Sequence, residues 1–250
     1  ARDVNRLRLG LQYEAWDLDT ACRDWAIWSD LAQFVQSPDP LFVAENLYDS
    51  ALRETLDLDL VALFDRAGRL VWGRRWAPGA QPDSDVLPMV LSASGDNPFL
   101  VGSPGDGRPG VAGIRLTPDG AMILAVRPIR ERADSEPVGT LVMGRLLHAR
   151  RTAWLGQRTG LKLRFRDSNR DRFSLRETTR LRDLDLEPFA VEAREQDATL
   201  YLRVPDLAGD GFLVASIAWP REQVAQGRQA AVTIAFSLFV AILLMLVALG

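Results

Sequence analysis

The chain has 250 residues, a formal net charge of −3 and a hydrophobic fraction of 47%, a composition typical of a globular protein with one large domain or two small ones. With 30 basic and 33 acidic residues it lacks the basic excess of nucleic-acid binders, so no nucleic-acid partner is expected. The single cysteine, Cys22, excludes an intrachain disulfide and a thiolate metal cluster, and the single histidine, His148, argues against a histidine metal site or a Ser-His-Asp triad.

The N-terminal segment predicts one long amphipathic helix over residues 2–35, ended by Pro38 and Pro40. At the usual rise per residue this helix would be about 50 Å long, enough to dimerise or to stand off a membrane. Its apolar stripe consists of Leu11, Ala15, Leu18, Cys22, Trp25, Trp28, Ala32 and Val35.

Two tryptophans three residues apart, Trp25 and Trp28, lie on this stripe and are flanked by Asp24 and Asp30. The pair could form a ligand-binding box or a structural contact. We favour the structural role, in which the rings clamp the helix onto a sheet and the carboxylates hold nearby backbone or an arginine.

An α+β domain is predicted to follow, because runs with strand character alternate with short helices. The turn at residues 65–68 ends in Gly68, the residue type that a positive φ requires. The expected elements are a helix at 41–56, strands at 58–65 and 69–73, a helix at 86–93, a loop at 94–109, and strands at 111–116, 121–129 and 138–146. These five strands are expected to form one sheet.

Residues 148–219 are predicted to add a helix at 148–159 that ends at Gly160, a strand at 161–166 and a hairpin of strands 199–204 and 212–218. Charge is concentrated in residues 167–187, which we interpret as a surface loop or insertion. The sequence leaves open whether this part joins the main sheet or forms a separate subdomain.

The C-terminal run from Ala230 to Gly250 contains no charged residue and is long enough to cross the hydrocarbon core of a bilayer. A helix opening at Pro220 and Arg221 is expected to lead into this transmembrane segment, with the lipid bilayer as its partner. Because the chain begins at Ala1 without a signal-peptide pattern, we expect that it is processed or a fragment.

Catalytic motifs are absent: the sequence has no phosphate-binding P-loop, dinucleotide fingerprint, HExxH or GxSxG. The pairs Asp57/Asp59 and Asp183/Asp185 are interpreted as turn formers, and Asp206 with Asp210 lacks the spacing of a calcium-binding EF-hand. No enzyme activity, cofactor or metal site is expected in this segment.

Strand alternation singles out five candidate ligand-binding residues: Trp72, Arg74, Arg127, Met143 and Arg145. If the strand register brought them together, three guanidinium groups would surround a concave surface suited to a carboxylate or phosphate. The alternative is that each arginine extends to water at a strand end.

The order of these elements and several short motifs resemble the fourth type of CHASE domain, part of the Cache-like group of extracellular sensory domains in bacterial membrane receptors. The resemblance covers residues 2–227, with residues 167–187 matching least. It rests on Asp24-Trp25, Trp28, Asp30, Phe34-Val35, Asn46-Leu47, Phe64-Asp65, Gly68, Pro128-Ile129, the run Gly139 to Arg145, Thr159-Gly160-Leu161 and Pro220-Arg221.

This resemblance implies a periplasmic domain held in the bacterial inner membrane, with a first span before Ala1 and a cytoplasmic output after Gly250. Outputs in similar receptors include diguanylate cyclases, phosphodiesterases and histidine kinases. The fold it implies is a long N-terminal helix along a PAS-like antiparallel sheet. The output type and the ligand's identity stay open.

We therefore expect a homodimeric sensory input domain that binds a small, anionic ligand and signals through its membrane helix. The alternative is a periplasmic protein-interaction module without a small ligand; a membrane-anchored enzyme is the least favoured hypothesis. The expected organisation is a signalling and dimer helix at 1–37, a sensory core at 38–147, a helix-and-strand extension at 148–219, and a juxtamembrane and transmembrane helix at 220–250.

Overall fold

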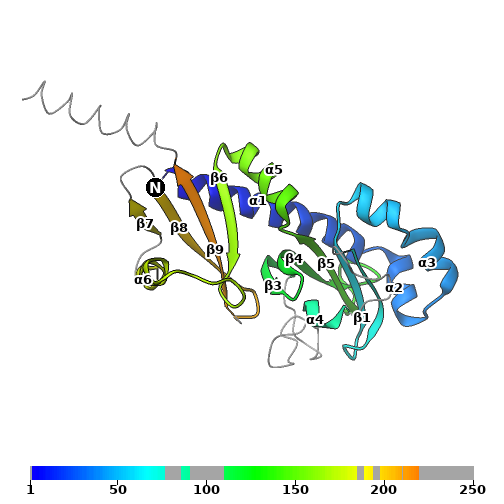
Figure 1. The fold of residues 1–250 in the computed structure, drawn as a ribbon. Coiled ribbons are helices and arrows are strands. Elements are labelled where there is room, and N and C mark those ends of the chain that lie inside the picture. Colours follow the sequence, from blue (N-terminus) through cyan, green and yellow to red (C-terminus); the bar gives the residue numbers. More distant parts are fainter. Residues whose placement is uncertain are drawn as a thin grey trace, which may run out of the picture.

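A computed structural model describes residues 2–76, 86–90, 110–184, 189–193, 198–209 and 211–219 of the chain. Two antiparallel sheets lie side by side, and one helix, α1 (Arg2–Ala26), runs along both of them (Figure 1). The expected α+β class and long N-terminal helix are confirmed.

The first sheet has the strand order β2-β1-β5-β4-β3, with every neighbouring pair antiparallel. It confirms the expectation that these five strands form one sheet. Its strands are β1 (Leu60–Asp65), β2 (Leu70–Arg75), β3 (Val111–Thr117), β4 (Gly120–Ile129) and β5 (Gly139–Leu146). The turn between β1 and β2 places Gly68 at a φ of 77°, as its sequence predicts.

Side-chain alternation gives the first sheet two apolar faces. Val61 and Leu63 of β1 face α1, whereas Leu60 and Phe64 belong to a second cluster with α4 (Leu87–Val90). The described part of the helix expected at residues 86–93 is therefore α4, and the loop expected at 94–109 lies outside the described residues.

The second sheet answers the question that the sequence left open, since residues 162–219 form their own sheet in the order β6-β9-β8-β7. Its strands are β6 (Lys162–Asp167), β7 (Ala190–Ala193), β8 (Ala198–Pro205) and β9 (Phe212–Trp219). The predicted hairpin of β8 and β9 is confirmed. Helix α5 (Ala149–Thr159) connects the two sheets and ends at Gly160 in the left-handed conformation, as expected.

One stripe of α1 supplies the core shared by both sheets. Leu7 and Leu11 belong to the same buried cluster as strand residues of the second sheet, and Leu18 and Cys22 are fully buried against the first sheet. The Cys22 thiol lies 3.7 Å from the carbonyl oxygen of Ala125, and burial raises its pKa. Because this thiol stays protonated and enclosed, it is a core group rather than a reactive one.

A buried ion pair joins the two sheets on the side opposite α5. Arg115 Nη1 of β3 lies 2.8 Å from Asp206 Oδ2, in the turn between β8 and β9, and both side chains are almost fully enclosed. The other carboxylate oxygen accepts the backbone N–H of Leu116 at 2.7 Å, and the Leu207 N–H donates to the Ile114 carbonyl. Asp206 therefore fixes the orientation of the second sheet and is not part of a calcium loop.

The prediction of a single helix over residues 2–35 is wrong. The helix is interrupted at Ile27–Trp28, and a second helix, α2 (Ser29–Gln36), follows. Trp28 has extended backbone angles, and Arg130 donates its N–H to the Ala26 carbonyl freed at the end of α1. No glycine or proline signals this break. It is imposed by tertiary contacts of the β4–β5 loop and of the Trp28 ring.

The second predicted helix is also shorter than expected. Residues 41–56 form α3 (Pro40–Asn46) and the π-helical turn η1 (Ser50–Thr55), with a break at Leu47–Asp49. Leu47 and Leu52 of this segment are buried in the core. The break places η1 beside the start of β1, where it forms one wall of the cleft described below.

The prediction of a loop at residues 167–187 is also corrected, because this segment contains the helix α6 (Leu175–Asp183). A capping box starts this helix: the Ser174 hydroxyl accepts the Glu177 N–H, and the Glu177 carboxylate accepts the Ser174 N–H. The dense charge of the segment concealed this S-x-x-E signal.

The predicted membrane segment at 230–250, together with Pro220 and Arg221, lies outside the described residues, so these expectations stay predictions. Within the described ranges, no helix combines the length and the apolar character needed to cross a bilayer.

Replacing Arg115 with Met should lower the free energy of unfolding by about 3–5 kcal/mol, because the Asp206 carboxylate would stay buried without its counter-ion. Urea denaturation would measure this loss. Arg69→Met, which removes an arginine that is 82% exposed from its pair with Asp65, is the control and should cost less than about 1 kcal/mol. Equal losses in both variants would contradict a structural role for the buried pair.

Glu177→Gln should destabilise the domain by about 2–3 kcal/mol at neutral pH while keeping the capping geometry. The hydrogen bond from Arg166 lowers the pKa of Glu177 to about 2, so the ionised carboxylate stabilises the folded state. This contribution is complete above pH 4.5, the ordinary pKa of a glutamate, and disappears as the pH falls towards 2. Unfolding curves of both proteins should therefore converge in that window; the exposed Glu45→Gln is the control.

Candidate functional site

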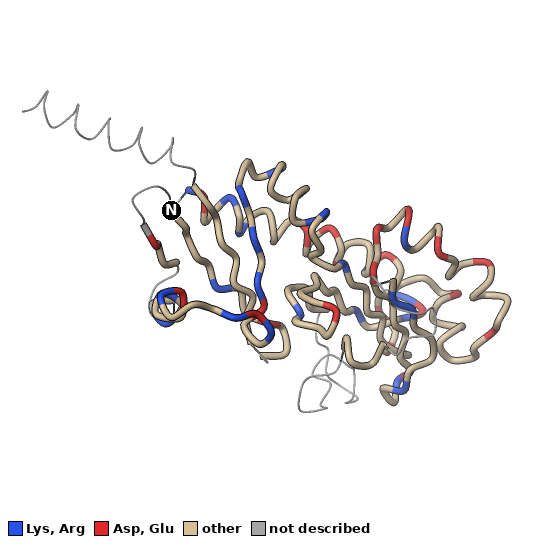
Figure 2. Tube along the Cα trace, viewed as in Figure 1, with Lys and Arg blue, Asp and Glu red and all other residues tan. Residues whose placement is uncertain are grey.

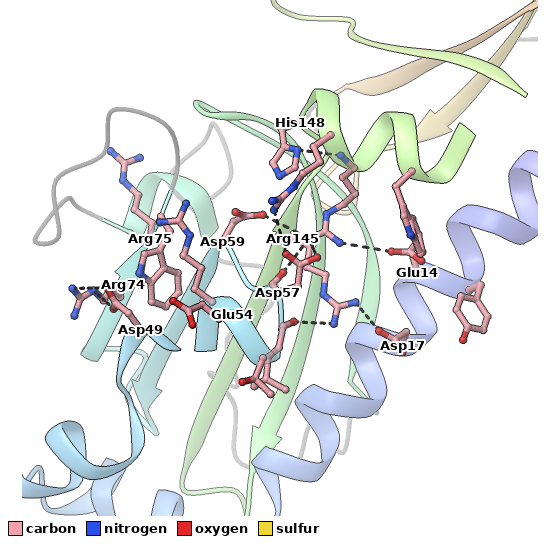
Figure 3. Close-up of a pocket in the computed structure, with 18 of the residues that line it drawn as sticks. Glu14, Asp17, Asp49, Glu54, Asp57, Asp59, Arg74, Arg75, Arg145 and His148 are labelled. Atoms are coloured by element: carbon pink, nitrogen blue, oxygen red, sulfur yellow. Dashed lines mark hydrogen bonds and ion pairs between the residues drawn. The ribbon is translucent and has the colours of Figure 1, made fainter. Parts of the chain in front are cut away.

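A cleft with a volume of about 1280 Å³ opens where α1, η1, α5 and the first sheet meet (Figure 3). One wall comes from α1 and α5, and the other comes from η1 and the end of β2. Its lining residues include Tyr13, Glu14, Asp17, Asp49, Arg53, Glu54, Leu56, Asp57, Asp59, Arg74, Arg75, Trp76, Arg145, His148, Arg150, Arg151, Trp154 and Arg158. Arginines and acidic residues lie close together in this part of the chain (Figure 2).

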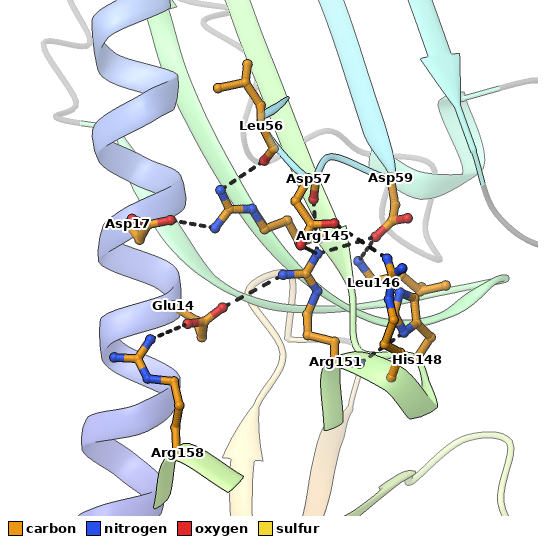
Figure 4. A network of polar contacts seen from close by, with 11 residues as sticks. Glu14, Asp17, Leu56, Asp57, Asp59, Arg145, Leu146, His148, Arg151 and Arg158 are labelled. Carbon is orange, nitrogen blue, oxygen red and sulfur yellow. Dashed lines mark hydrogen bonds and ion pairs between the residues drawn. The ribbon is translucent and has the colours of Figure 1, made fainter. Parts of the chain in front are cut away.

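Arg151 of α5 is the centre of the polar network at the back of the cleft (Figure 4). Its Nη2 lies 2.8 Å from Asp57 Oδ2, and its Nη1 lies 3.8 Å from Glu14 Oε2 of α1. Because the Arg151 side chain is 7% exposed, these contacts are shielded from solvent and tie α5 to α1 and to the start of β1.

Arg145 makes the second link between the sheet and α1. Its Nη1 lies 2.6 Å from Asp17 Oδ2, and its Nη2 donates to the Leu56 carbonyl at 3.0 Å. The guanidinium group therefore bridges α1 and the end of η1 across the floor of the cleft. A shift of either wall would change the geometry of this bridge.

Glu14 is a carboxylate buried inside the network, with an exposed fraction of 4%. Desolvation raises its pKa, and the positive charges of Arg151, Arg145 and Arg158 offset this only in part. Burial therefore disfavours the charged form of Glu14, whereas the surrounding arginines favour it.

The outer rim of the cleft is aromatic. The guanidinium of Arg158 lies between two rings, 4.4 Å from the Tyr13 ring centre and 4.7 Å from that of Trp154. Both rings are more than 40% exposed. This side of the cleft therefore offers flat apolar surface next to a held positive charge.

The opposite wall presents Arg74, Arg75 and Trp76 at the end of β2. Arg74 pairs with Asp49 of the η1 side at 3.2 Å and lies over the Trp76 ring at 6.0 Å. Arg75 pairs with Asp119 at 3.1 Å. The backbone N–H of Trp76 donates to the Asp59 carbonyl, which holds the end of β2 beside the start of β1.

The strand register places all five sequence-predicted ligand residues on the face of the first sheet that α1 covers. Arg74 and Met143 both pair with Val61 of β1. Arg74 and Arg145 line the cleft, whereas Trp72, Met143 and Arg127 are not among its lining residues. Met143 is fully buried, and Arg127 forms an ion pair with Asp19 of α1. A role of any of the five in ligand binding stays a prediction.

The aromatic pair of the N-terminal segment lies at the far end of α1 from the second sheet. The Trp28 ring packs against Trp25 at 5.8 Å and against Phe42 of α3 at 5.4 Å. Asp24 is exposed beside Arg23, and Asp30 accepts a hydrogen bond from Ser29. These residues join three helices, and their proposed part in signalling stays a prediction.

The sequence interpretation missed several residues of the site. His148 caps α5, since its Nδ1 accepts the Arg151 N–H, and Asp59 accepts the Leu146 N–H at 2.7 Å. Asp57 has a φ of 52°, in the region that disfavours non-glycine residues. The antiparallel pairing of β1 with β5 could have indicated this site. It places the residues just before β1, such as Asp57 and Asp59, next to the residues just after β5, such as His148.

Residues 10–166 match the CHASE4 domain family, which is more than half of the chain. The chain belongs to the CHASE4 family. CHASE4 domains are extracellular sensory domains of membrane receptors.

Among proteins of known function, the chain is 29% identical over 156 residues to the methanogenesis regulatory histidine kinase FilI of Methanothrix harundinacea (strain 6Ac). The match covers 62% of this chain but 17% of the kinase, so this chain spans a small part of its relative. The fold is similar to that of the extracellular domain of vpHK1S-Z8, with a TM-score of 0.55, 10% identity, and coverage of 90% of this chain and 94% of that domain.

The family match assigns this chain to the extracellular sensory domains of membrane receptors. Sensor domains of this kind are non-catalytic modules. Within the described residues, no group of three or more histidine, cysteine, aspartate or glutamate side chains is placed to hold a metal ion.

Glu14→Gln should become more stable than the parent protein as the pH rises above 4.5, the ordinary pKa of a glutamate. The raised pKa means that the folded state holds its proton longer than the unfolded state, so ionisation of Glu14 lowers stability with increasing pH. Urea denaturation between pH 4 and 8 would detect the difference. A variant that loses stability relative to the parent as the pH rises would show that the arginine contacts outweigh desolvation.

Proposed function

We propose that this CHASE4 domain is the periplasmic input domain of an inner-membrane receptor, and that a small ligand bound in the cleft changes the position of α1. The membrane helix at 230–250, a homodimeric state and the four-part division of the chain at residues 37, 147 and 219 belong to this proposal. Pro220 and Arg221 would begin the connection to the membrane.

The observation that carries the proposal is that one helix both lines the cleft and contacts the end of the second sheet. Tyr13, Glu14 and Asp17 of α1 line the cleft. In its first turn, Asp3 Oδ2 accepts the indole N–H of Trp219 at 2.9 Å. Trp219 is the last residue of β9 and directly precedes the predicted membrane-proximal helix.

The distance between these two contacts is short. Asp3 and Glu14 are eleven residues apart, about 16 Å along a helix. A helix transmits a shift along its axis with little loss, so a ligand that moved α1 at the cleft would also move Trp219. Signalling requires that the ligand bind one arrangement of α1 more tightly than the other, since tight binding alone shifts no equilibrium.

The output module would lie after Gly250. A histidine kinase is supported by the relative FilI, which is a methanogenesis regulatory histidine kinase. A diguanylate cyclase or phosphodiesterase, and with it cyclic di-GMP signalling, is the other output that the family resemblance suggests.

The alternative function is a protein-interaction module, and an exposed stripe on α1 favours it. Leu9, Tyr13 and Trp16 follow the i, i+4, i+7 spacing of one helix face and are 46–64% exposed. The Tyr13 and Trp16 rings lie 6.0 Å apart. Of these three residues, only Tyr13 lines the cleft.

Two exposed tryptophans provide a matched test between the functions. Trp154→Ala changes the cleft, whereas Trp16→Ala changes the stripe on α1. The purified chain would be screened by thermal denaturation against a broad panel of small metabolites. A ligand that raises the melting temperature of the parent should lose at least half of this shift in Trp154→Ala and keep it in Trp16→Ala.

Two results would overturn ligand sensing in the cleft. One is a folded protein that responds to no metabolite, and the other is a metabolite response that Trp16→Ala abolishes and Trp154→Ala preserves. Stoichiometric co-purification of a periplasmic protein that is lost in Trp16→Ala would favour the interaction module instead.

A further inference from the structure

At the rim of the cleft, the positive charge of Arg158 lies in a cage formed by Tyr13 and Glu14 of α1 and Trp154 of α5. The guanidinium carbon is 4.4 Å from the Tyr13 ring centre and 4.7 Å from that of Trp154, which lies one turn earlier on α5. Glu14 completes the cage, with Oε1 3.6 Å from Arg158 Nη1 (Figure 4). Two aromatic rings and a carboxylate around one cation form an arrangement by which proteins recognise organic cations.

The Arg158 side chain is accessible, and the cage does not depend on it for its walls. This side chain is 44% exposed, and its 3.6 Å distance to Glu14 exceeds that of a charge-assisted hydrogen bond. The two helices touch independently of it at Gly10 of α1, where an added Cβ would lie 3.0 Å from Thr159 and 3.1 Å from Leu155. If Arg158 turned out into water, the cage residues would therefore keep their positions.

Net charge does not decide which ligand the cleft prefers. Seven arginines and six carboxylates line it, and Asp119 pairs with Arg75 from outside, so positive and negative charges balance. Selection must then come from local arrangement. In the cage, the electron-rich faces of two rings and the Glu14 carboxylate all favour a positive charge. Tyr13 is 46% and Trp154 41% exposed, so a dissolved cation can reach both rings.

We propose that the ligand of the cleft is an organic cation whose guanidinium or quaternary ammonium group displaces Arg158 from the cage of Tyr13, Glu14 and Trp154. This inference rests on the proposed ligand-sensing function and adds the chemical class of the ligand. Arg158 ties α5 to α1 in this structure, whereas a ligand would contact the same groups without being attached to α5. The exchange releases the last turn of α5 from α1, so the ligand binds the two arrangements with different affinity, as signalling requires.

The Trp154 indole N–H reports directly on the cage. The chain has seven tryptophans, and Trp154→Phe identifies the Trp154 peak in the ¹H–¹⁵N correlation spectrum by its loss. The probes are methylguanidinium and tetramethylammonium, each compared with a neutral molecule of similar shape, methylurea and tert-butanol respectively. We expect a saturable shift of the Trp154 peak with at least one cation and no saturable shift with its neutral counterpart.

Removal of the internal cation should strengthen binding of the probe. Arg158→Ala should lower the Kd of the responding cation about fivefold, because the probe no longer has to displace a tethered guanidinium from the two rings. Arg23→Ala removes the same charge from an exposed arginine of α1 outside the cleft and should leave this Kd unchanged. A gain in Arg158→Ala alone therefore separates competition for the cage from a change in net charge.

Removal of one ring should weaken binding. Tyr13→Ala should raise the Kd of the responding cation about fivefold, because one of the two cation–π contacts is lost. Tyr48→Ala, which removes a similarly exposed tyrosine outside the cleft, is the control and should leave the Kd unchanged. The melting temperature of each variant without a probe controls for folding, and the spectra of the parent protein do not depend on any variant.

Three results would overturn the organic-cation assignment: a Trp154 peak that no cation moves, equal responses to a cation and its neutral counterpart, or an Arg158→Ala variant that binds the cation no more tightly than the parent. If the metabolite panel yields an uncharged or anionic ligand whose thermal shift is lost in Trp154→Ala, this inference fails and ligand sensing in the cleft stands. If neither the cations nor the metabolite panel give a response, the proposed function fails as well.

Discussion

The fold depends on one helix that is buried against two sheets at once. The stripe that includes Leu7, Leu11, Leu18 and Cys22 fills the space above both sheets, and ion pairs from Asp17 and Asp19 fix the helix to strands of the first sheet. Neither sheet can bury its inner face without this helix. Displacement of α1 would therefore expose apolar surface in both halves of the molecule, which restricts it to small shifts between packed arrangements.

The position of the cleft follows from this arrangement. α1 covers the centre of the first sheet. It leaves uncovered the corner of the sheet where β1 begins, β5 ends and η1 lies beside them. Loops converge at this corner, so polar groups gather there: Asp57, Asp59, His148 and Arg151 all lie just outside a strand or at a helix start. Arg145 and Glu14 then connect the corner to α1. The site is thus built from chain ends held by a rigid scaffold.

Local sequence patterns sufficed to predict most strands, the turn at Gly68, the end of α5 at Gly160 and the resemblance to a sensory domain. They failed where distant contacts decide the outcome. The break at Trp28 depends on Arg130 and Phe42, which lie in other elements, and the α6 capping box was hidden by surrounding charge. Strand alternation indicated which residues of one strand share a face. The register that brings these faces together, and the covering of Arg127 by α1, did not follow from it.

The hydrogen bond between Trp219 and Asp3 also has a topological consequence. The described chain returns at the end of β9 to the point where α1 begins, so its two ends are neighbours. Domains with adjacent ends tolerate circular permutation and insertion into another protein, because a short linker can replace the original termini. The described part of this CHASE4 domain could accordingly be inserted into an unrelated protein. Its two ends could be joined directly to a pair of adjacent helices without long linkers.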